Sequence, residues 1–253
     1  MCLGRSFVGQ TVDSFGIGVP ATTAYVRALS ATGADILALS ELPFEPKGQS
    51  ILAADLGRAL GLVSTSFLQL DSSWLDDGFS YGLGLATSWQ IVEERTLILK
   101  APLLTAEGPD GKPWRLHDKA IQWVLLKRDD KLVGVANLHL FPAHYFGHKL
   151  TDPPFEESLA KLAEFLVSAT PAGLPSLIVG DFNDRGFEAS DLLHHVLPRR
   201  FEEAIRCGTL LGRSDQVDHV FYSVDTLEKV EAEAFACPSD HMALRVRLQL
   251  RNS

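Results

Sequence analysis

The chain has 253 residues, of which 46% are hydrophobic, and its formal net charge is −9, with 23 Lys and Arg against 32 Asp and Glu. This composition is typical of a globular protein with a sizeable core. The deficit of basic residues argues against a long electrostatic interface with duplex nucleic acid, although it does not exclude short or single-stranded nucleic acid as a ligand.

No run of about 18 apolar residues occurs, which excludes a transmembrane helix, and we expect no membrane partner. Residues 1–7 lack the apolar core and cleavage site of a secretory signal, so a cytoplasmic location is expected. The three cysteines, Cys2, Cys207 and Cys237, are odd in number and far apart. They argue against a disulfide framework and against a thiolate zinc site.

Strand-like and helix-like segments alternate along the chain. A helix is predicted over residues 20–31, because this segment begins with Pro20 and runs to Gly33. A second helix is predicted over residues 154–168, with Glu156 and Glu157 in its first turn. The pair Asp129-Asp130 indicates a hairpin turn. Strands are predicted over residues 35–39, 83–91, 121–127, 132–140, 176–180, 217–222 and 242–250.

Hairpins mixed with strand–helix units predict an α/β fold. We expect two mixed β-sheets packed face to face with helices on the outside, a four-layer α-β-β-α sandwich. No internal repeat, low-complexity tract or Gly/Ser linker interrupts the chain, so residues 1–253 are expected to form one domain.

Five segments place polar, metal-competent side chains at the ends of apolar strands. A strand-end acid is usually a surface residue, and the tripeptide after Gly180 would also fit a turn in which Asp or Asn bonds its own backbone. Alternation places Asn137 and His139 on one strand face. Each segment alone is a weak signal, but together and in chain order they are a strong one; their polar residues include Glu41, His139, Asp181, Asn183, Asp218, Asp240 and His241.

The same segments resemble the endonuclease/exonuclease/phosphatase superfamily, which includes apurinic endonucleases, pancreatic-type deoxyribonuclease, neutral sphingomyelinases and inositol polyphosphate phosphatases. Residues 180–183 match its GDFN element and residues 239–241 its SDH element. Residues 39–41 look like its LQE, residues 137–140 like its NTHL, and residues 217–220 like its IDHI. Residues 81–88 are similar to its central YGNAILS-type strand.

The resemblance implies hydrolysis of a phosphoester at a Mg²⁺ or Mn²⁺ centre. A hard divalent cation neutralises phosphoryl charge and stabilises the leaving oxygen, and carboxylates are suited to hold it. Glu41 and Asp240 would be the principal metal ligands. Asp181 would orient or deprotonate the attacking water, and in a two-metal site it would share the second metal position.

The remaining site residues would act on the phosphoryl group and on protons. Asn183 would donate hydrogen bonds to a phosphoryl oxygen without adding charge. Asp218 would orient the imidazole of His241, and either His241 or Asp181 would serve as the general base. His139 would contact the phosphate or protonate the leaving group.

Two positions depart from the family pattern. Members usually carry an asparagine in the first strand as a metal-site residue, but here no asparagine precedes Asn137. Residues 7–12 fit that strand and place Gln10 where the asparagine belongs, so Gln10 is expected as a neutral amide ligand of the metal. If the strand lies elsewhere, Gln10 is merely exposed. The second departure is Leu138, which replaces a threonine or serine beside the site.

The substrate is expected to be a small or locally recognised phosphoester, such as a nucleotide, a nucleic acid or another phosphodiester, and the protein is expected to be a monomer. The alternative from another class is a family member that lost turnover and acts as a module binding phosphate ligands. No HExxH or comparable zinc spacing exists among the histidines, so a separate zinc site is not favoured.

Overall fold

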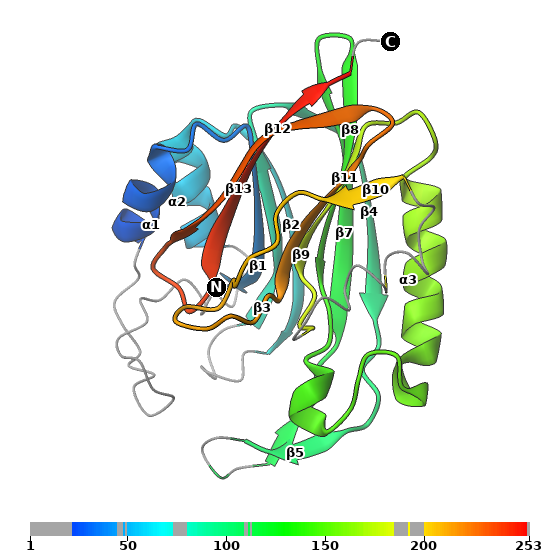
Figure 1. Ribbon diagram of the computed structural model, residues 1–253. Coiled ribbons are helices and arrows are strands. Elements are labelled where there is room, and N and C mark those ends of the chain that lie inside the picture. Colours follow the sequence, from blue (N-terminus) through cyan, green and yellow to red (C-terminus); the bar gives the residue numbers. More distant parts are fainter. Residues whose placement is uncertain are drawn as a thin grey trace.

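The computed structural model describes residues 22–44, 48, 50–72, 80–108, 111, 113–184, 192 and 200–251. Two β-sheets lie face to face at its centre (Figure 1). The smaller sheet contains β1 (Ile36–Phe44), β2 (Ser64–Ser72) and β3 (Ser80–Thr87). The larger sheet contains β4 (Gln90–Leu99), β7 (Lys119–Arg128), β8 (Lys131–His139), β9 (Ser176–Asp181), β10 (Phe201–Glu203) and β11 (Asp218–Ser223).

The order of the strands determines which chain ends meet. In the larger sheet the order is β10-β11-β9-β8-β7-β4, and β8 and β9 form a parallel pair among otherwise antiparallel neighbours. In the smaller sheet the order is β1-β3-β2, with both pairs antiparallel. Because β8 and β9 are parallel, their carboxyl ends lie at the same edge of the larger sheet.

Three helices cover the outer faces of the two sheets (Figure 1). Helices α1 (Thr22–Ser30) and α2 (Ile51–Leu60) pack on the smaller sheet, and α3 (Glu156–Ala169) packs on the larger one. Helix α2 begins at Ser50, whose side chain accepts a hydrogen bond from the backbone of Ala53, and ends at Gly61 in the left-handed conformation. A 3-10 turn over Pro153–Phe155 precedes α3.

Two hairpins and a second short helix complete the described chain. One hairpin is formed by β12 (Leu227–Ala236) and β13 (Met242–Leu250). It contacts apolar residues beneath α1 and α2 at one end and apolar residues beside β11 at the other. The hairpin of β5 (Thr105–Glu107) and β6 (Pro113–Arg115) contacts the 3-10 helix Ala143–Phe146, which follows β8. None of the described helices is long and apolar enough to cross a membrane.

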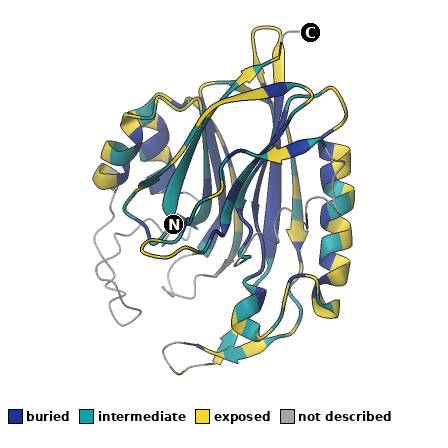
Figure 2. Cartoon of the chain, viewed as in Figure 1, coloured by how far each residue is buried: buried dark blue, intermediate teal, exposed yellow. Residues whose placement is uncertain are grey.

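Apolar clusters fill each of the three interfaces between the layers. Figure 2 shows that the buried residues concentrate on the central strands and on the inner faces of the helices. The cluster beneath α1 and α2 includes Tyr25, Leu29, Leu42 and Leu56. The cluster between the sheets includes Leu85, Val124, Leu126 and Val135. The cluster beneath α3 includes Ile121, Trp123, Leu162, Leu166 and Ile178. The predicted four-layer fold is therefore confirmed.

A buried amide ties the two sheets together. The Nδ2 atom of Asn137 in β8 donates hydrogen bonds to the carbonyl oxygens of Leu39 in β1 and Gly84 in β3, each at 3.1 Å. Asn137 is only 1% exposed, so these bonds form away from water, where an unpaired carbonyl would be costly. Asn137 therefore lies between the sheets and fixes β1 close to Glu41.

One predicted strand is wrong in its boundaries. The segment predicted as a single strand over residues 83–91 is divided between β3 and β4 by a bend at Ser88 and Trp89. The backbone amide of Ser88 donates to the carbonyl of Asp35 at 2.9 Å, and the side chain of Thr87 bonds the same carbonyl. These bonds fix the bend at the start of β1, so the apolar run passes from one sheet to the other.

Candidate active site

Three predicted site residues lie side by side on adjacent strands of the larger sheet. His139 ends β8 and pairs with Asp181, which ends β9, and Asp181 pairs in turn with Asp218, which begins β11. These pairings bring together residues that are 79 positions apart in the chain. The pairing register of β8, β9 and β11 therefore brings these three side chains together at one end of the larger sheet.

The position of Asp181 depends on the glycine before it. Gly180 has φ 135°, and a Cβ atom there would overlap the carbonyl oxygen of Leu138 in β8. Asp181 is 5% exposed, and its Oδ1 accepts a hydrogen bond from the backbone of Asn183 at 2.8 Å. Burial raises the pKa of Asp181 to about 7, with a further contribution from the negative charge of Asp218.

Asn183 is held at the same edge by its own side chain. Its φ is 53°, and its Nδ2 donates to the carbonyl of Leu140 at 2.9 Å, just beyond β8. A primary amide carries two N–H donors, and this bond uses one of them. The same nitrogen carries a second N–H, and the donor role of Asn183 stays a prediction.

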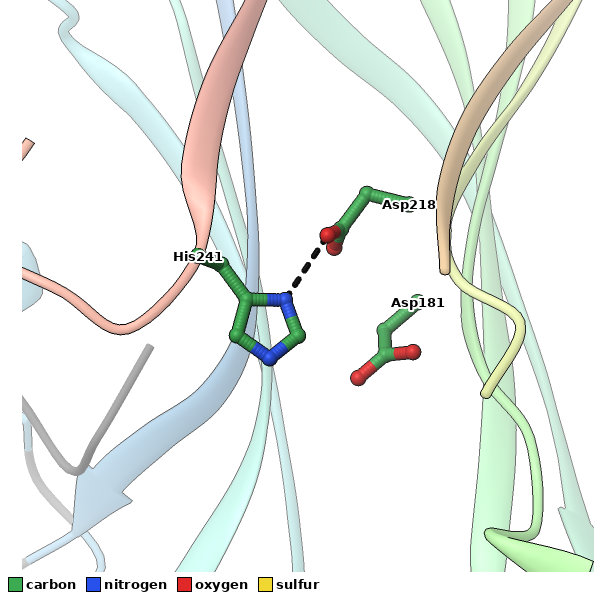
Figure 3. A group of neighbouring side chains, drawn as sticks. All are labelled: Asp181, Asp218 and His241. Carbon is green, nitrogen blue, oxygen red and sulfur yellow. Dashed lines mark hydrogen bonds and ion pairs between the residues drawn. The ribbon is translucent and has the colours of Figure 1, made fainter. Parts of the chain in front are cut away.

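Asp218 and His241 form a hydrogen-bonded pair (Figure 3). The Nδ1 atom of His241 lies 2.7 Å from Oδ2 of Asp218, and the other ring nitrogen points away from Asp218. Burial acts to lower the pKa of His241, but the charge of Asp218 outweighs it and raises the pKa to about 9. The bond to the carboxylate fixes the imidazole with Nδ1 as donor and leaves Nε2 facing the site.

A residue that the sequence did not indicate holds both members of this pair in place. Thr209 is fully buried, and its Oγ1 accepts hydrogen bonds from the backbone of Val217 at 2.9 Å and of Asp218 at 3.0 Å. Its carbonyl accepts from the backbone of Met242 at 2.6 Å. The start of β11 and the chain after His241 are thus fixed to one residue. Only its position in the loop before β11 could have suggested it.

Glu41 is placed by a β-bulge. Leu39 pairs with Gly84 and Leu42 with Gly82, so Ser40 and Glu41 together face the single residue Leu83 of β3. Glu41 has φ 52°, in the left-handed region that non-glycine residues rarely occupy. Its negative charge acts to raise the pKa of Asp181 and that of Lys119. The strained backbone therefore directs this carboxylate toward the same site.

One group of His and Asp side chains lies close enough together to hold a metal ion. Ligand atoms of Asp181, Asp218 and His241 all lie within 4.8 Å of one another. Glu41 and Asp240 are not members of this group in the described part of the chain. Asp240 lies in the loop before β13, where its Oδ1 accepts from the Ser239 hydroxyl at 3.2 Å and its carbonyl accepts from Leu211.

The chemistry of these donors fits a hard cation. Because the pKa of His241 is raised to about 9, both of its ring nitrogens carry a proton at neutral pH, and the ligand atoms that the group offers there are the carboxylate oxygens of Asp181 and Asp218. The charge of Glu41 adds to theirs. Crowded carboxylates repel one another unless a cation lies between them, and oxygen-rich sets of this kind suit Mg²⁺ or Mn²⁺.

His139 contacts both an acid and a base. Its Nε2 lies 3.6 Å from Oδ2 of Asp181 and 3.1 Å from Nζ of Lys119. His139 is 1% exposed, and burial together with the charge of Lys119 holds its pKa well below the usual range. The ring is therefore neutral. Lys119 itself was not among the predicted residues, because nothing in its local sequence marks it as buried.

The remaining predicted ligand, Gln10, lies outside the described residues, as do His194 and His195. Leu138, the second departure from the family pattern, is fully buried in the cluster beneath α3. It therefore packs in the core on the side of β8 opposite to the sheet interface.

Solved structures with the same architecture come from distant organisms. An endonuclease/exonuclease/phosphatase from Beutenbergia cavernae aligns with a TM-score of 0.69 at 17% identity, covering 98% of this chain and 69% of that one. A mannosyl-6-phosphatase from Bacteroides thetaiotaomicron aligns at 0.62 and 17%, covering 97% of both chains. The human Nocturnin catalytic domain with bound sulfate aligns at 0.62 and 17%, covering 91% of this chain and 86% of that one.

A search of curated protein sequences finds no match. The sequence model of the Endonuclease/Exonuclease/phosphatase family, however, matches residues 18–241. This match includes Glu41, His139, Asp181, Asp218 and His241, whereas Gln10 precedes it. Because the match covers most of the chain and the layers agree with the solved structures, the chain belongs to the endonuclease/exonuclease/phosphatase family.

Proposed function

We propose that residues 1–253 form one catalytic domain that hydrolyses phosphoesters with the help of Mg²⁺ or Mn²⁺. The observation that carries the proposal is the alignment of His139, Asp181 and Asp218 on adjacent strands, with His241 bonded to Asp218. The similar structures include a mannosyl-6-phosphatase and a domain that binds sulfate, an anion with the shape of phosphate. Both agree with a site for a tetrahedral anion.

Glu41, Asp240 and Gln10 would hold the cation together with the oxygens of Asp181. When bound, the cation supplies charge neutralisation at the phosphoryl group and at the leaving oxygen. The neutral amide of Gln10 is a weaker ligand than a carboxylate, so a readily exchanging metal is expected. Gln10→Ala should then raise the magnesium concentration needed for half-maximal rate, and Gln10→Asn should preserve activity or raise it.

The side chains of the site position the water, transfer protons and contact the phosphate. Asp181 orients the attacking water and accepts its proton, because its Oδ1 is held by Asn183 while its Oδ2 faces the site. The second N–H of Asn183 donates to a phosphoryl oxygen. The imidazole of His241, oriented by Asp218, transfers protons on the side of the phosphoryl group opposite to the attacking water. His139 contacts the phosphate as a neutral ring.

The substrate is proposed to be a small or locally recognised phosphoester. A net charge of −9 disfavours a long polyanion, since few cations are available to replace its counterions. A nucleotide, another small phosphodiester or monoester, or a short single strand suits this charge. The enzyme is proposed to act as a monomer.

Hydrolysis of p-nitrophenyl phosphate and bis-p-nitrophenyl phosphate tests the proposal, with magnesium, with manganese and with a chelator. We expect metal-stimulated release of p-nitrophenol from at least one ester and its loss in Glu41→Ala. Glu93→Ala is the matched control, because Glu93 is an exposed acid on β4. Absence of hydrolysis by a folded protein that still binds metal would instead favour the non-catalytic binding module.

A further inference from the structure

The site contains a buried positive charge that the mechanism above does not use. Lys119 is the first residue of β7 and is 6% exposed. Among the described residues, no carboxylate lies within 4.0 Å of its ammonium group in an ion pair. Buried lysines are usually paired, since an isolated ammonium loses its hydration without compensation.

The ammonium is held by the faces of aromatic rings rather than by an anion. Nζ lies 3.1 Å from Nε2 and 3.5 Å from Nδ1 of His139, and 5.1 Å from the centroid of the Tyr81 ring. An in-plane bond to one imidazole nitrogen would leave the other nitrogen much farther away. The nearly equal distances therefore place the ammonium over the ring face. These contacts position the charge without neutralising it.

The nearest negative charges are those of the catalytic carboxylates. Burial lowers the pKa of Lys119, whereas the charges of Glu41 and Asp181 oppose this shift. Lys119 and Asp181 both approach the same atom, Nε2 of His139, at 3.1 and 3.6 Å. The ammonium is thus next to the group proposed to orient the attacking water, and among the described residues its contacts are with aromatic rings rather than with a paired carboxylate.

We propose that Lys119 is a catalytic residue that donates hydrogen bonds to a nonbridging oxygen of the phosphoryl group and supplies the second positive charge of the site, so that one divalent cation suffices. This inference rests on the proposed function. In the reaction, the water oxygen bonds to phosphorus, the bond to the leaving oxygen breaks, one proton of the water passes to Asp181, and the leaving oxygen takes a proton from the charged imidazole of His241. Lys119 keeps its three protons throughout.

Two opposite effects distinguish this role from a structural one. Removing the ammonium withdraws positive charge from a cluster of acids, so divalent cations should bind more tightly. Removing it also takes a donor and a charge away from the anion, so phosphate should bind more weakly. A lysine that only supports the fold would change both affinities in the same direction or neither of them.

The test compares the parent protein with Lys119→Gln, Lys119→Arg and the control Lys100→Gln, which removes an exposed lysine paired with Asp118. Free Mn²⁺ is counted by electron paramagnetic resonance, and inorganic phosphate binding is measured calorimetrically with saturating magnesium. In Lys119→Gln we expect phosphate to bind at least ten-fold more weakly, and Mn²⁺ to bind several-fold more tightly or at a second position. Lys119→Arg should retain phosphate binding within a few-fold, and Lys100→Gln should match the parent.

Several results would overturn the inference. They are unchanged phosphate affinity in a folded Lys119→Gln protein, or two Mn²⁺ ions bound per parent molecule. Should Lys119→Gln fail to fold, the contact is tested in the parent protein by NMR with ¹³C-labelled lysine. One of its nine lysine signals, the one missing in Lys119→Arg, must shift when phosphate is added with magnesium. A stationary signal refutes the contact.

The same data separate this inference from the proposed function. A parent protein that hydrolyses phosphoesters with a metal, alongside a Lys119→Gln protein that binds phosphate equally well, overturns only the role of Lys119. A parent protein that binds neither Mn²⁺ nor phosphate overturns the proposed function itself.

Discussion

Replacing Asp218 with asparagine tests the proton-transfer pair directly. The substitution keeps the size of the side chain and an oxygen that can accept from Nδ1 of His241, which now lies 2.7 Å from the carboxylate. It removes only the negative charge. The backbone bond from residue 218 to Thr209 does not involve the side chain and should persist, so the variant is expected to fold.

The size of the effect follows from the pKa of His241. This pKa is raised from 6.5 to about 9, against the lowering effect of burial and chiefly by the charge of Asp218. At about 1.4 kcal/mol per pH unit, the charged imidazole gains about 3 kcal/mol. If turnover uses this oriented imidazole, Asp218→Asn should lower kcat about 100-fold, and more if the ring adopts the wrong tautomer.

The assay is kcat for a chromogenic phosphoester at saturating magnesium from pH 6 to 10. Asp215→Asn is the control, because Asp215 lies in the same loop but pairs with the exposed Arg213. Thermal unfolding of the metal-free proteins adds a second measurement. Since the folded pKa of His241 is the higher one, its stabilising contribution is complete below pH 6.5 and disappears as the pH rises through 9. Near-normal turnover in Asp218→Asn would remove the pair from the mechanism.

Three further substitutions give distinct outcomes. Asp181→Asn should abolish turnover yet raise the melting temperature of the metal-free protein by several degrees at pH 8. The folded pKa of Asp181, about 7, exceeds the unfolded value of 3.8, so its ionisation opposes folding above pH 4 and does so fully above pH 7. Gly180→Ala should destabilise the fold by roughly 3 kcal/mol or more in urea unfolding, because positive φ and overlap with a neighbouring carbonyl act together. Asn137→Leu should cost about 2–4 kcal/mol by leaving two buried carbonyls unpaired, and should raise the magnesium concentration for half-maximal rate by displacing Glu41.

Gly180→Ala has a matched control, and each of the three predictions has a result that would contradict it. Gly212→Ala isolates the backbone strain, because φ there is 73° with nothing within 4 Å of an added Cβ, and should cost only about 1–2 kcal/mol. Equal costs at the two glycines would contradict the overlap with β8. A metal-free Asp181→Asn protein that melts below its parent would show that ionisation of the Asp181 carboxylate does not oppose folding. An Asn137→Leu protein with unchanged magnesium dependence would separate the sheet contact from the position of Glu41.

The parts of the site that the sequence could predict are those fixed by short segments. Asp181 and Asn183 follow an apolar strand immediately, and Gly180 is required there by close contact with β8. The parallel pairing of β8 with β9 then brings His139 to Asp181. Because strand ends meet at one edge of a sheet, the order of these segments was sufficient to predict that they converge.

The parts that escaped prediction depend on contacts between distant segments. Lys119 is buried only because the rings of Tyr81 and His139 lie around it. Thr209 acts through bonds to β11 and to the backbone of Met242, both remote from its own loop.

Some secondary structure also escaped prediction for the same reason. The segment of β12, rich in Glu and Ala, has helix-forming residues but becomes a strand by pairing along its length with β13. The run over residues 83–91 contains no proline, and its division at Ser88 and Trp89 is fixed by bonds to the distant residue Asp35. Helix α2, which was not predicted, does carry local signals, namely Ser50 before it and Gly61 after it.

The bulge in β1 has a consequence for how this site can be gained or lost. Ser40 and Glu41 share the place of one residue opposite Leu83, so the direction of the carboxylate depends on how many residues the strand contains. Deleting Ser40 would restore a regular ladder and keep every acidic group of the site in the sequence, yet it would leave Glu41 alone opposite Leu83 and remove the left-handed backbone conformation that now sets the direction of its carboxylate. Scans that exchange one side chain for another cannot reveal this dependence. A single-codon deletion can, and it would produce a folded protein that retains all its catalytic side chains but has lost its affinity for the cation.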